Sequence, residues 1–124
     1  MADKLEQMFT LRKEFMSALQ AQVPDVYPEM PIDLTKKQTQ QHLRDLALRG
    51  VEEVFEAVQE LKNAKAHRQT EIKEFDRAAF KEEMVDAFNY FLSLLIIMGV
   101  TPDELFEAYA NKDRIIHDRI KSKY

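Results

Sequence analysis

The chain has 124 residues, a formal net charge of −4 and no cysteine. This length is typical of one domain that buries its own core, and the lack of thiols excludes disulfides, thiolate metal sites and cysteine nucleophiles. The net negative charge disfavours a general nucleic-acid-binding protein. The first residues lack the apolar region of a signal peptide, so we expect a cytoplasmic protein.

Apolar residues recur at helical spacing along most of the chain, and no alternating strand pattern persists. A first helix is expected over residues 4–22. Pro24, Pro28 and Pro31 then predict an extended connection, because proline interrupts a helix. A second helix is expected from near Asp33 or Thr35 to about residue 66, followed by a polar segment at about 67–74.

A third helix is expected over residues 75–98, and Gly99 suits its end. Residues 87–100 contain no charged side chain. This stretch is too short to span a bilayer, which needs about 20 apolar residues. We therefore expect a buried core helix or a helix at a subunit interface.

The start of a fourth helix is marked by Thr101, Pro102 and Glu104. Thr101 suits the N-cap, Pro102 the first helical position and Glu104 the far side of a capping box. This helix is expected to run to the end of the chain. The sequence therefore predicts an all-α fold, a four-helix bundle in a single domain over residues 1–124.

Two groups of carboxylates stand out on the second and third expected helices. Glu53 and Glu56 are three residues apart, as are Glu83 and Asp86, so each pair shares one helix surface. An acidic run alone is usually a solvated face, but the second pair begins the most apolar stretch of the chain, where an unpaired anion is costly. If the two helices pack antiparallel, both pairs converge. Such oxygen ligands suit Mg²⁺ or Mn²⁺.

The last expected helix carries an excess of cations. Tyr109, Lys112 and Arg119 share one of its faces. One interpretation is that these cations complement the helix dipole or form surface ion pairs. The other is that they bind a phosphate-bearing ligand.

The two acidic motifs together resemble a known signature. Glu52-Glu53-x-x-Glu56 has the form EExxE, and 26 residues separate it from Glu83-x-x-Asp86, which has the form ExxD. From about Leu11 to its end, the chain is similar to the all-α nucleoside triphosphate pyrophosphatases, specifically their MazG-like and dimeric dUTPase branches. Residues 83–94 resemble the metal-binding helix of dimeric dUTPases. The C-terminal pattern of that branch is echoed by Tyr109, Lys112, Arg119 and Tyr124.

This resemblance implies a reaction and a set of roles. A nucleoside triphosphate, the expected partner, would be hydrolysed between its α- and β-phosphates to a monophosphate and pyrophosphate, with metal ions lowering the pKa of the attacking water. Two or more Mg²⁺ or Mn²⁺ ions would be bound by Glu53, Glu56, Glu83 and Asp86. Glu52 would support them, Lys112 and Arg119 would bind phosphate oxygens, and either Glu53 or Glu56 would be the general base.

The chain departs from the family pattern where the base is read. Arg12 and Met16 stand where dimeric dUTPases carry a Gln and an Asn on the first helix. The base therefore stays open between uracil and a purine, as in dGTP or dATP, since an arginine pairs well with O6 and N7 of guanine. Phe15, Asn89 and Tyr109 are further candidate contacts to the base or sugar, although such residues are as often part of a core.

Other classes of protein fit less well. A ferritin-like di-iron bundle needs Glu-x-x-His pairs, which the three histidines do not form, and no P-loop occurs. The remaining alternative is a non-enzymatic interaction bundle that assembles through residues 88–98. In either case we expect a homodimer or homotetramer, because the third helix offers more apolar surface than four helices of this length cover. A nucleic-acid or membrane partner is not expected.

Overall fold

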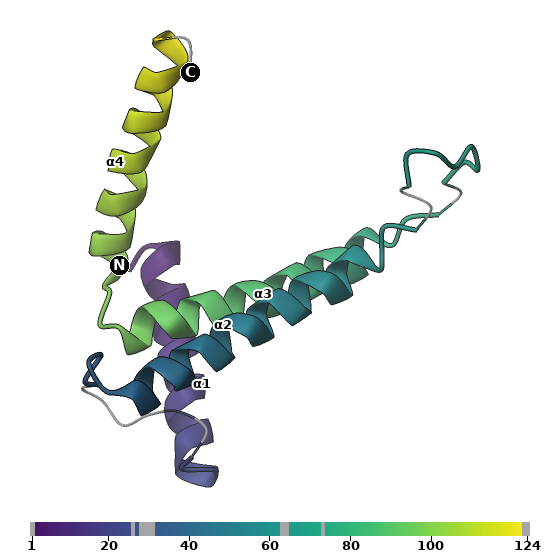
Figure 1. The fold of residues 1–124 in the computed structure, drawn as a ribbon. Coiled ribbons are helices and arrows are strands. Elements are labelled where there is room, and N and C mark those ends of the chain that lie inside the picture. Colours follow the sequence, from purple (N-terminus) through teal and green to yellow (C-terminus); the bar gives the residue numbers. More distant parts are fainter. Residues whose placement is uncertain (1, 26, 28–31, 63–64, 73, 123–124) are drawn as a thin grey trace.

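The computed structural model describes residues 2–25, 27, 32–62, 65–72 and 74–122. These residues form four α-helices and no strand: α1 (Lys4–Gln22), α2 (Lys37–Val58), α3 (Arg77–Ile97) and α4 (Pro102–Lys121) (Figure 1). The all-α class predicted from the sequence is confirmed. Pro28 and Pro31, in the expected extended connection, lie outside the described residues.

The helices α2 and α3 lie side by side and antiparallel, and α1 crosses this pair (Figure 1). The core sits at the crossing. Phe9 and Met16 of α1 meet Leu46 of α2 and the apolar face of α3, where Leu92 and Ile97 are each only 2% exposed. Burial at this crossing stabilises the fold, because helices of this length are marginal alone.

Side chains next to the helix ends fix three of the four starts. Asp3 accepts a hydrogen bond from the Glu6 amide at 2.8 Å, and Asp76 accepts one from the Ala79 amide at 3.0 Å. Thr101 accepts from the amide of Glu104 at 3.1 Å, so the predicted N-cap of the fourth helix is confirmed.

The second helix is shorter than predicted at both ends. It begins after a turn in which Asp33 accepts hydrogen bonds from the backbone and hydroxyl of Thr35, and it ends at Val58 rather than near residue 66. Its last turns carry Glu52, Glu53 and Glu56 and its last turn has no basic residue. Glu56, in the last turn, opposes the negative end of the helix dipole, and no basic residue there offsets it.

The fourth helix projects away from the other three (Figure 1). Among the described helices it packs on α1 alone, and none of its residues is buried. Phe106, Tyr109 and Ile120 are 64%, 71% and 63% exposed. Gly99, with φ of 80°, makes the left-handed turn that redirects the chain. A single chain therefore does not close the four helices into one bundle.

The third helix has two apolar faces of different fate. One is buried in the core, while Val85 and Phe88 on its other surface are 52% and 42% exposed, and Met98, directly after the helix, is 50% exposed. Within the described residues, no single helix has the length and apolarity to cross a membrane; α3 and α4 meet that test only as a pair bent by 108°.

Candidate metal centre and adjoining cavity

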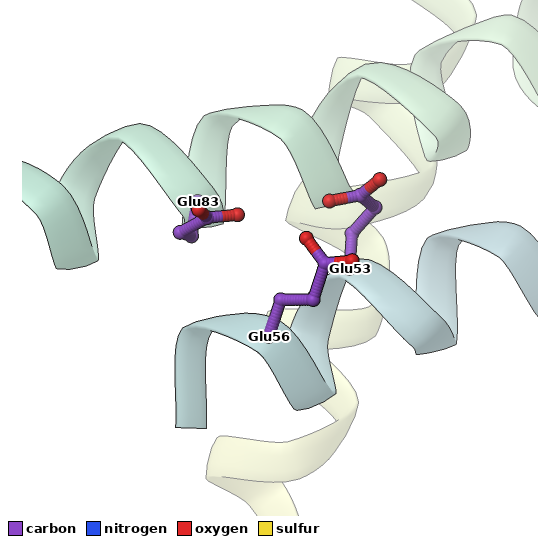
Figure 2. A group of neighbouring side chains, drawn as sticks. All are labelled: Glu53, Glu56 and Glu83. Atoms are coloured by element: carbon purple, nitrogen blue, oxygen red, sulfur yellow. The ribbon is translucent and has the colours of Figure 1, made fainter. Parts of the chain in front are cut away.

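Three carboxylates from two helices meet in one place. Glu53 and Glu56 come from α2 and Glu83 from α3, and one oxygen of each lies within 4.8 Å of the others. Figure 2 shows the three side chains directed into the same space between the two helices. The antiparallel packing thus brings together the two acidic motifs that the sequence places 26 residues apart.

Small residues allow α2 and α3 to approach closely beside this group. Ala57 and Ala87 are buried, with exposures of 0% and 2%. A Cβ atom at Gly50 would lie 3.2 Å from Cβ of Tyr90 and 3.3 Å from the ring of Phe91. The short distance between the two backbones is what lets side chains from both helices share one site.

Two carboxyls of this group have pKa values above their ordinary range. Partial burial, a hydrogen bond with Glu56 and the charges of Glu56, Asp86 and Glu83 raise the pKa of Glu53 above its ordinary value. Partial burial and the charges of Glu56 and Asp86 likewise raise the pKa of Glu83. Glu53 and Glu83 are therefore harder to ionise, first because they are partly removed from water and second because charged carboxylates lie nearby. A bound cation would reverse this effect.

The other two predicted carboxylates lie beside the group of three. Asp86 acts on both Glu53 and Glu83 through its charge. The sequence places Asp86 in apolar surroundings, which is wrong: its side chain is exposed, because that surface of α3 is itself open to solvent. Glu52 is exposed on α2 and is not a member of the group of three.

The donor set fits a hard divalent cation. Three carboxylates supply only oxygen ligands, which suit Mg²⁺, Mn²⁺ or Ca²⁺ rather than softer metals. Their mutual distances place one oxygen from each within reach of a single ion. A cluster of three acidic residues able to hold a metal ion is therefore present, as the sequence predicts.

A cavity of about 630 Å³ adjoins the carboxylates. Glu53 and Asp86 line it together with Arg12 and Phe15 of α1 and Asn89 of α3. Three of the predicted base or sugar contacts thus share one space with two of the predicted metal ligands. The volume is in the range of small-molecule sites.

One buried residue behind the cavity wall and two residues that line the cavity were not assigned a role from the sequence. Ser93 is fully buried and accepts a hydrogen bond from Arg12 at 2.8 Å. His42 and Arg49 of α2 line the cavity, and Arg49 pairs with Asp45 at 3.0 Å. A signal for Arg49 exists in the sequence, since it precedes Glu53 by one helical turn. The signal for Ser93 is only its polarity within an apolar helix.

The cations of the fourth helix lie away from the carboxylates of the same chain. Glu83 is 14 residues before the end of α3, about 21 Å at the rise of an α-helix, and Lys112 is 10 residues into α4, about 15 Å. The chain bends by 108° between the two helices. Lys112, Arg119 and Tyr109 therefore do not reach the group of carboxylates within a single chain.

Comparison of the chain with protein-family models, with curated proteins and with solved structures finds no match.

Proposed function

We propose that this protein is a metal-dependent nucleoside triphosphate pyrophosphohydrolase. The observation that carries the proposal is the meeting of Glu53, Glu56 and Glu83 from two helices, at the edge of a cavity lined by Arg12 and Phe15. A cluster of carboxylates can hold a hard cation that binds phosphates, and the cationic and aromatic side chains beside it can contact a base. Together they fit a nucleotide that carries phosphates. The likeness of the EExxE and ExxD motifs to the all-α pyrophosphatases supports the same reaction.

The metal ligands in this proposal are Glu53, Glu56, Glu83 and Asp86. Two or more Mg²⁺ or Mn²⁺ ions held by them would offset the charge of the phosphates and lower the pKa of the attacking water. The pKa values of Glu53 and Glu83 are raised first by partial burial and then by the neighbouring carboxylates. A bound cation would offset both costs of ionising these groups, which supports the assignment.

The general base in this proposal is Glu53. It belongs to the carboxylate group and also lines the cavity, whereas Glu56 is exposed and does not line it. In this proposal Glu53 accepts a proton from water as the water oxygen bonds to the α-phosphorus. The bond to the α,β-bridging oxygen breaks, and pyrophosphate leaves the nucleoside monophosphate.

The phosphate-binding cations in this proposal, Lys112 and Arg119, come from a second copy of the chain. The exposed apolar side chains of α4 match an apolar groove of about 370 Å³ between α1 and α3, lined in part by Leu11, Val85 and Phe88. Basic α4 residues would then approach the acidic surface of α2 and α3. We therefore propose a homodimer, or a tetramer built from such dimers.

A non-enzymatic interaction bundle is the alternative. The large exposed apolar surface favours assembly in both cases. In the enzyme the carboxylates are needed for catalysis, and in the interaction bundle they are not. The activities of two matched variants of acidic residues therefore distinguish the two hypotheses.

The test compares Glu53→Gln with Glu82→Gln, an exposed glutamate next to Glu83. We expect Glu53→Gln to lower kcat for pyrophosphate release by at least about 100-fold, the usual contribution of a general base. Glu82→Gln should retain wild-type kcat, and EDTA should abolish the activity of both. Equal activity of Glu53→Gln and Glu82→Gln would contradict the proposal and favour the interaction bundle.

A further inference from the structure

The side chain of Arg12 is held at two points beside the cavity. Its Nε donates a hydrogen bond to Oγ of Ser93 at 2.8 Å, and its guanidinium carbon lies 4.5 Å from the centre of the Phe15 ring. Ser93 is fully buried in α3, so it is a fixed anchor. A guanidinium held in this way loses little further conformational freedom when it binds a ligand.

The anchoring bond decides which donors of Arg12 are left for a ligand. The bond to Ser93 uses Nε, and the remaining donors are the two terminal nitrogens, Nη1 and Nη2. These form a planar pair of parallel donors. Arg12 lines the same cavity as Glu53 and Asp86, so the donors and the carboxylates face one ligand-sized space.

Two parallel donors require two adjacent acceptors. Guanine presents O6 and N7 side by side, whereas adenine places an amino donor beside N7. Uracil flanks O4 with an imino donor on one side and a carbon on the other. Cytosine presents O2 beside the acceptor N3. Guanine and cytosine are therefore the bases whose edges match the two donors of Arg12.

A second polar group in the cavity separates these two bases. Guanine carries an imino and an amino donor side by side, which together can engage both oxygens of one carboxylate, whereas cytosine offers only its amino group. The carboxylates of Asp25 and Asp45 line the cavity and accept such donors. Asp45 is already paired with Arg49 at 3.0 Å, which leaves Asp25 as the acceptor best suited to guanine.

We propose that Arg12 selects the base in this cavity and that the base is guanine. The inference rests on the proposed function, since it names guanine nucleoside triphosphates as the substrate class of the same site. Ser93 is a positioning residue, because it lies outside the cavity lining and acts on the base only through Arg12.

The first arm of the test compares nucleotides on the wild-type protein. Pyrophosphate release is measured with dGTP, 7-deaza-dGTP, dATP, dCTP and dUTP at equal Mg²⁺. We expect the highest kcat/KM for dGTP and a value about tenfold lower for 7-deaza-dGTP, which lacks the N7 acceptor. Equal kcat/KM for dGTP and dUTP would overturn the inference.

The second arm uses Arg12→Gln, Ser93→Ala and, as a matched control on the exposed side of α1, Lys13→Gln. Arg12→Gln should lower kcat/KM for dGTP by about 10- to 100-fold and leave the value for 7-deaza-dGTP less affected. Ser93→Ala should reduce the ratio of dGTP to dUTP activity by a smaller factor without changing Mn²⁺ affinity. Lys13→Gln should change neither.

Failure of the inference differs from failure of the proposed function. If Arg12→Gln lowers kcat/KM for every nucleotide by the same factor, Arg12 does not select the base and the inference is wrong. If no nucleotide is cleaved, the proposed function is wrong, and binding of the α,β-imido analogues of dGTP and dUTP then decides the role of Arg12. Equal affinity for the two analogues, or affinities that Arg12→Gln leaves unchanged, overturns it.

Discussion

Partial burial and the neighbouring carboxylates all raise the pKa of Glu53. It lies on α2 within 4.8 Å of oxygens from Glu56 and Glu83, and the charge of Asp86 also raises its pKa. The folded protein therefore holds a proton on this carboxyl more tightly than the unfolded chain does. This difference makes the stability of the metal-free protein depend on pH.

The direction in which stability changes with pH follows from the raised pKa values of Glu53 and Glu83. Because the native state binds more protons, these groups lower the free energy of unfolding as pH rises from the ordinary pKa through the raised one. In EDTA at about pH 7.5, Glu53→Gln should therefore raise the Tm, and near pH 4, where the group is protonated, it should change the Tm less.

With divalent metal, the wild type should have a higher Tm than Glu53→Gln, the reverse of their order in EDTA. Added Mn²⁺ should raise the Tm of the wild type at neutral pH and leave that of Glu53→Gln nearly unchanged, because binding to the native state alone stabilises it. Circular dichroism melts with and without EDTA measure both effects. A lower Tm of Glu53→Gln than of the wild type in EDTA at neutral pH would show that the carboxylates do not repel one another.

At this scale the sequence predicts part of the site. The carboxylates could be predicted because their spacing places each pair on one surface of a helix whatever the tertiary structure. The bond between Arg12 and Ser93 could not, because these residues are 81 positions apart and meet only where α1 crosses α3. Side chains that share one surface of a helix can be predicted from sequence, whereas contacts between helices that cross cannot.

At the scale of elements, the close packing of α2 on α3 depends on Gly50. A side chain at this position would meet Cβ of Tyr90, which moves only with the backbone of α3. Gly50→Val should therefore destabilise the protein by about 1–3 kcal/mol, as overpacking of a tight contact usually does. It should also weaken Mn²⁺ binding, because separation of the helices moves Glu83 away from Glu53.

Urea denaturation at one fixed protein concentration measures the stability of Gly50→Val. Gly99→Ala is the comparison, because a Cβ there meets no atom within 4 Å and only the positive φ is strained. It should lose stability while keeping its Mn²⁺ affinity. Unchanged stability and unchanged Mn²⁺ affinity of Gly50→Val would contradict the close approach of α2 and α3.

The helix boundaries show what local signals determine. The start of α4 is encoded by Thr101 and Pro102, whose effects do not extend beyond one turn, and it was predicted correctly. The end of α2 is marked by no glycine or proline. The apolar pattern continues past Val58, so it predicts too long a helix.

At the scale of the whole molecule, α4 is the element left without a packing partner for most of its surface. Its direction is set by the turn at Gly99, and the apolar pattern of the sequence carries no information on that direction. The all-α class was therefore predictable, while the separation of Lys112 and Arg119 from the carboxylates was not. Exposed residues such as Phe106 and Tyr109 fit a helix that packs on a second copy.

If α4 of one copy completes the site of the other, as proposed, two inactive variants should restore each other's activity. Glu53→Gln and Arg119→Ala should each be inactive alone, and after mixing and subunit exchange about a quarter of the wild-type activity should return. That fraction follows because half of the dimers are mixed and each has one intact site. Sedimentation of the wild type should show a dimer at micromolar concentration. Mixtures that stay inactive although mixed dimers form would show that the cations act within their own chain.

The central claim is that this protein cleaves nucleoside triphosphates between the α- and β-phosphates with metal held by the carboxylates of α2 and α3. The most direct measurement is ³¹P nuclear magnetic resonance of the products formed from dGTP with Mg²⁺. We predict signals of dGMP and pyrophosphate in equal amounts, formed by the wild type and not by Glu53→Gln. Signals of a nucleoside diphosphate and inorganic phosphate, or dGTP left intact by the wild type together with every other nucleoside triphosphate, would contradict the claim.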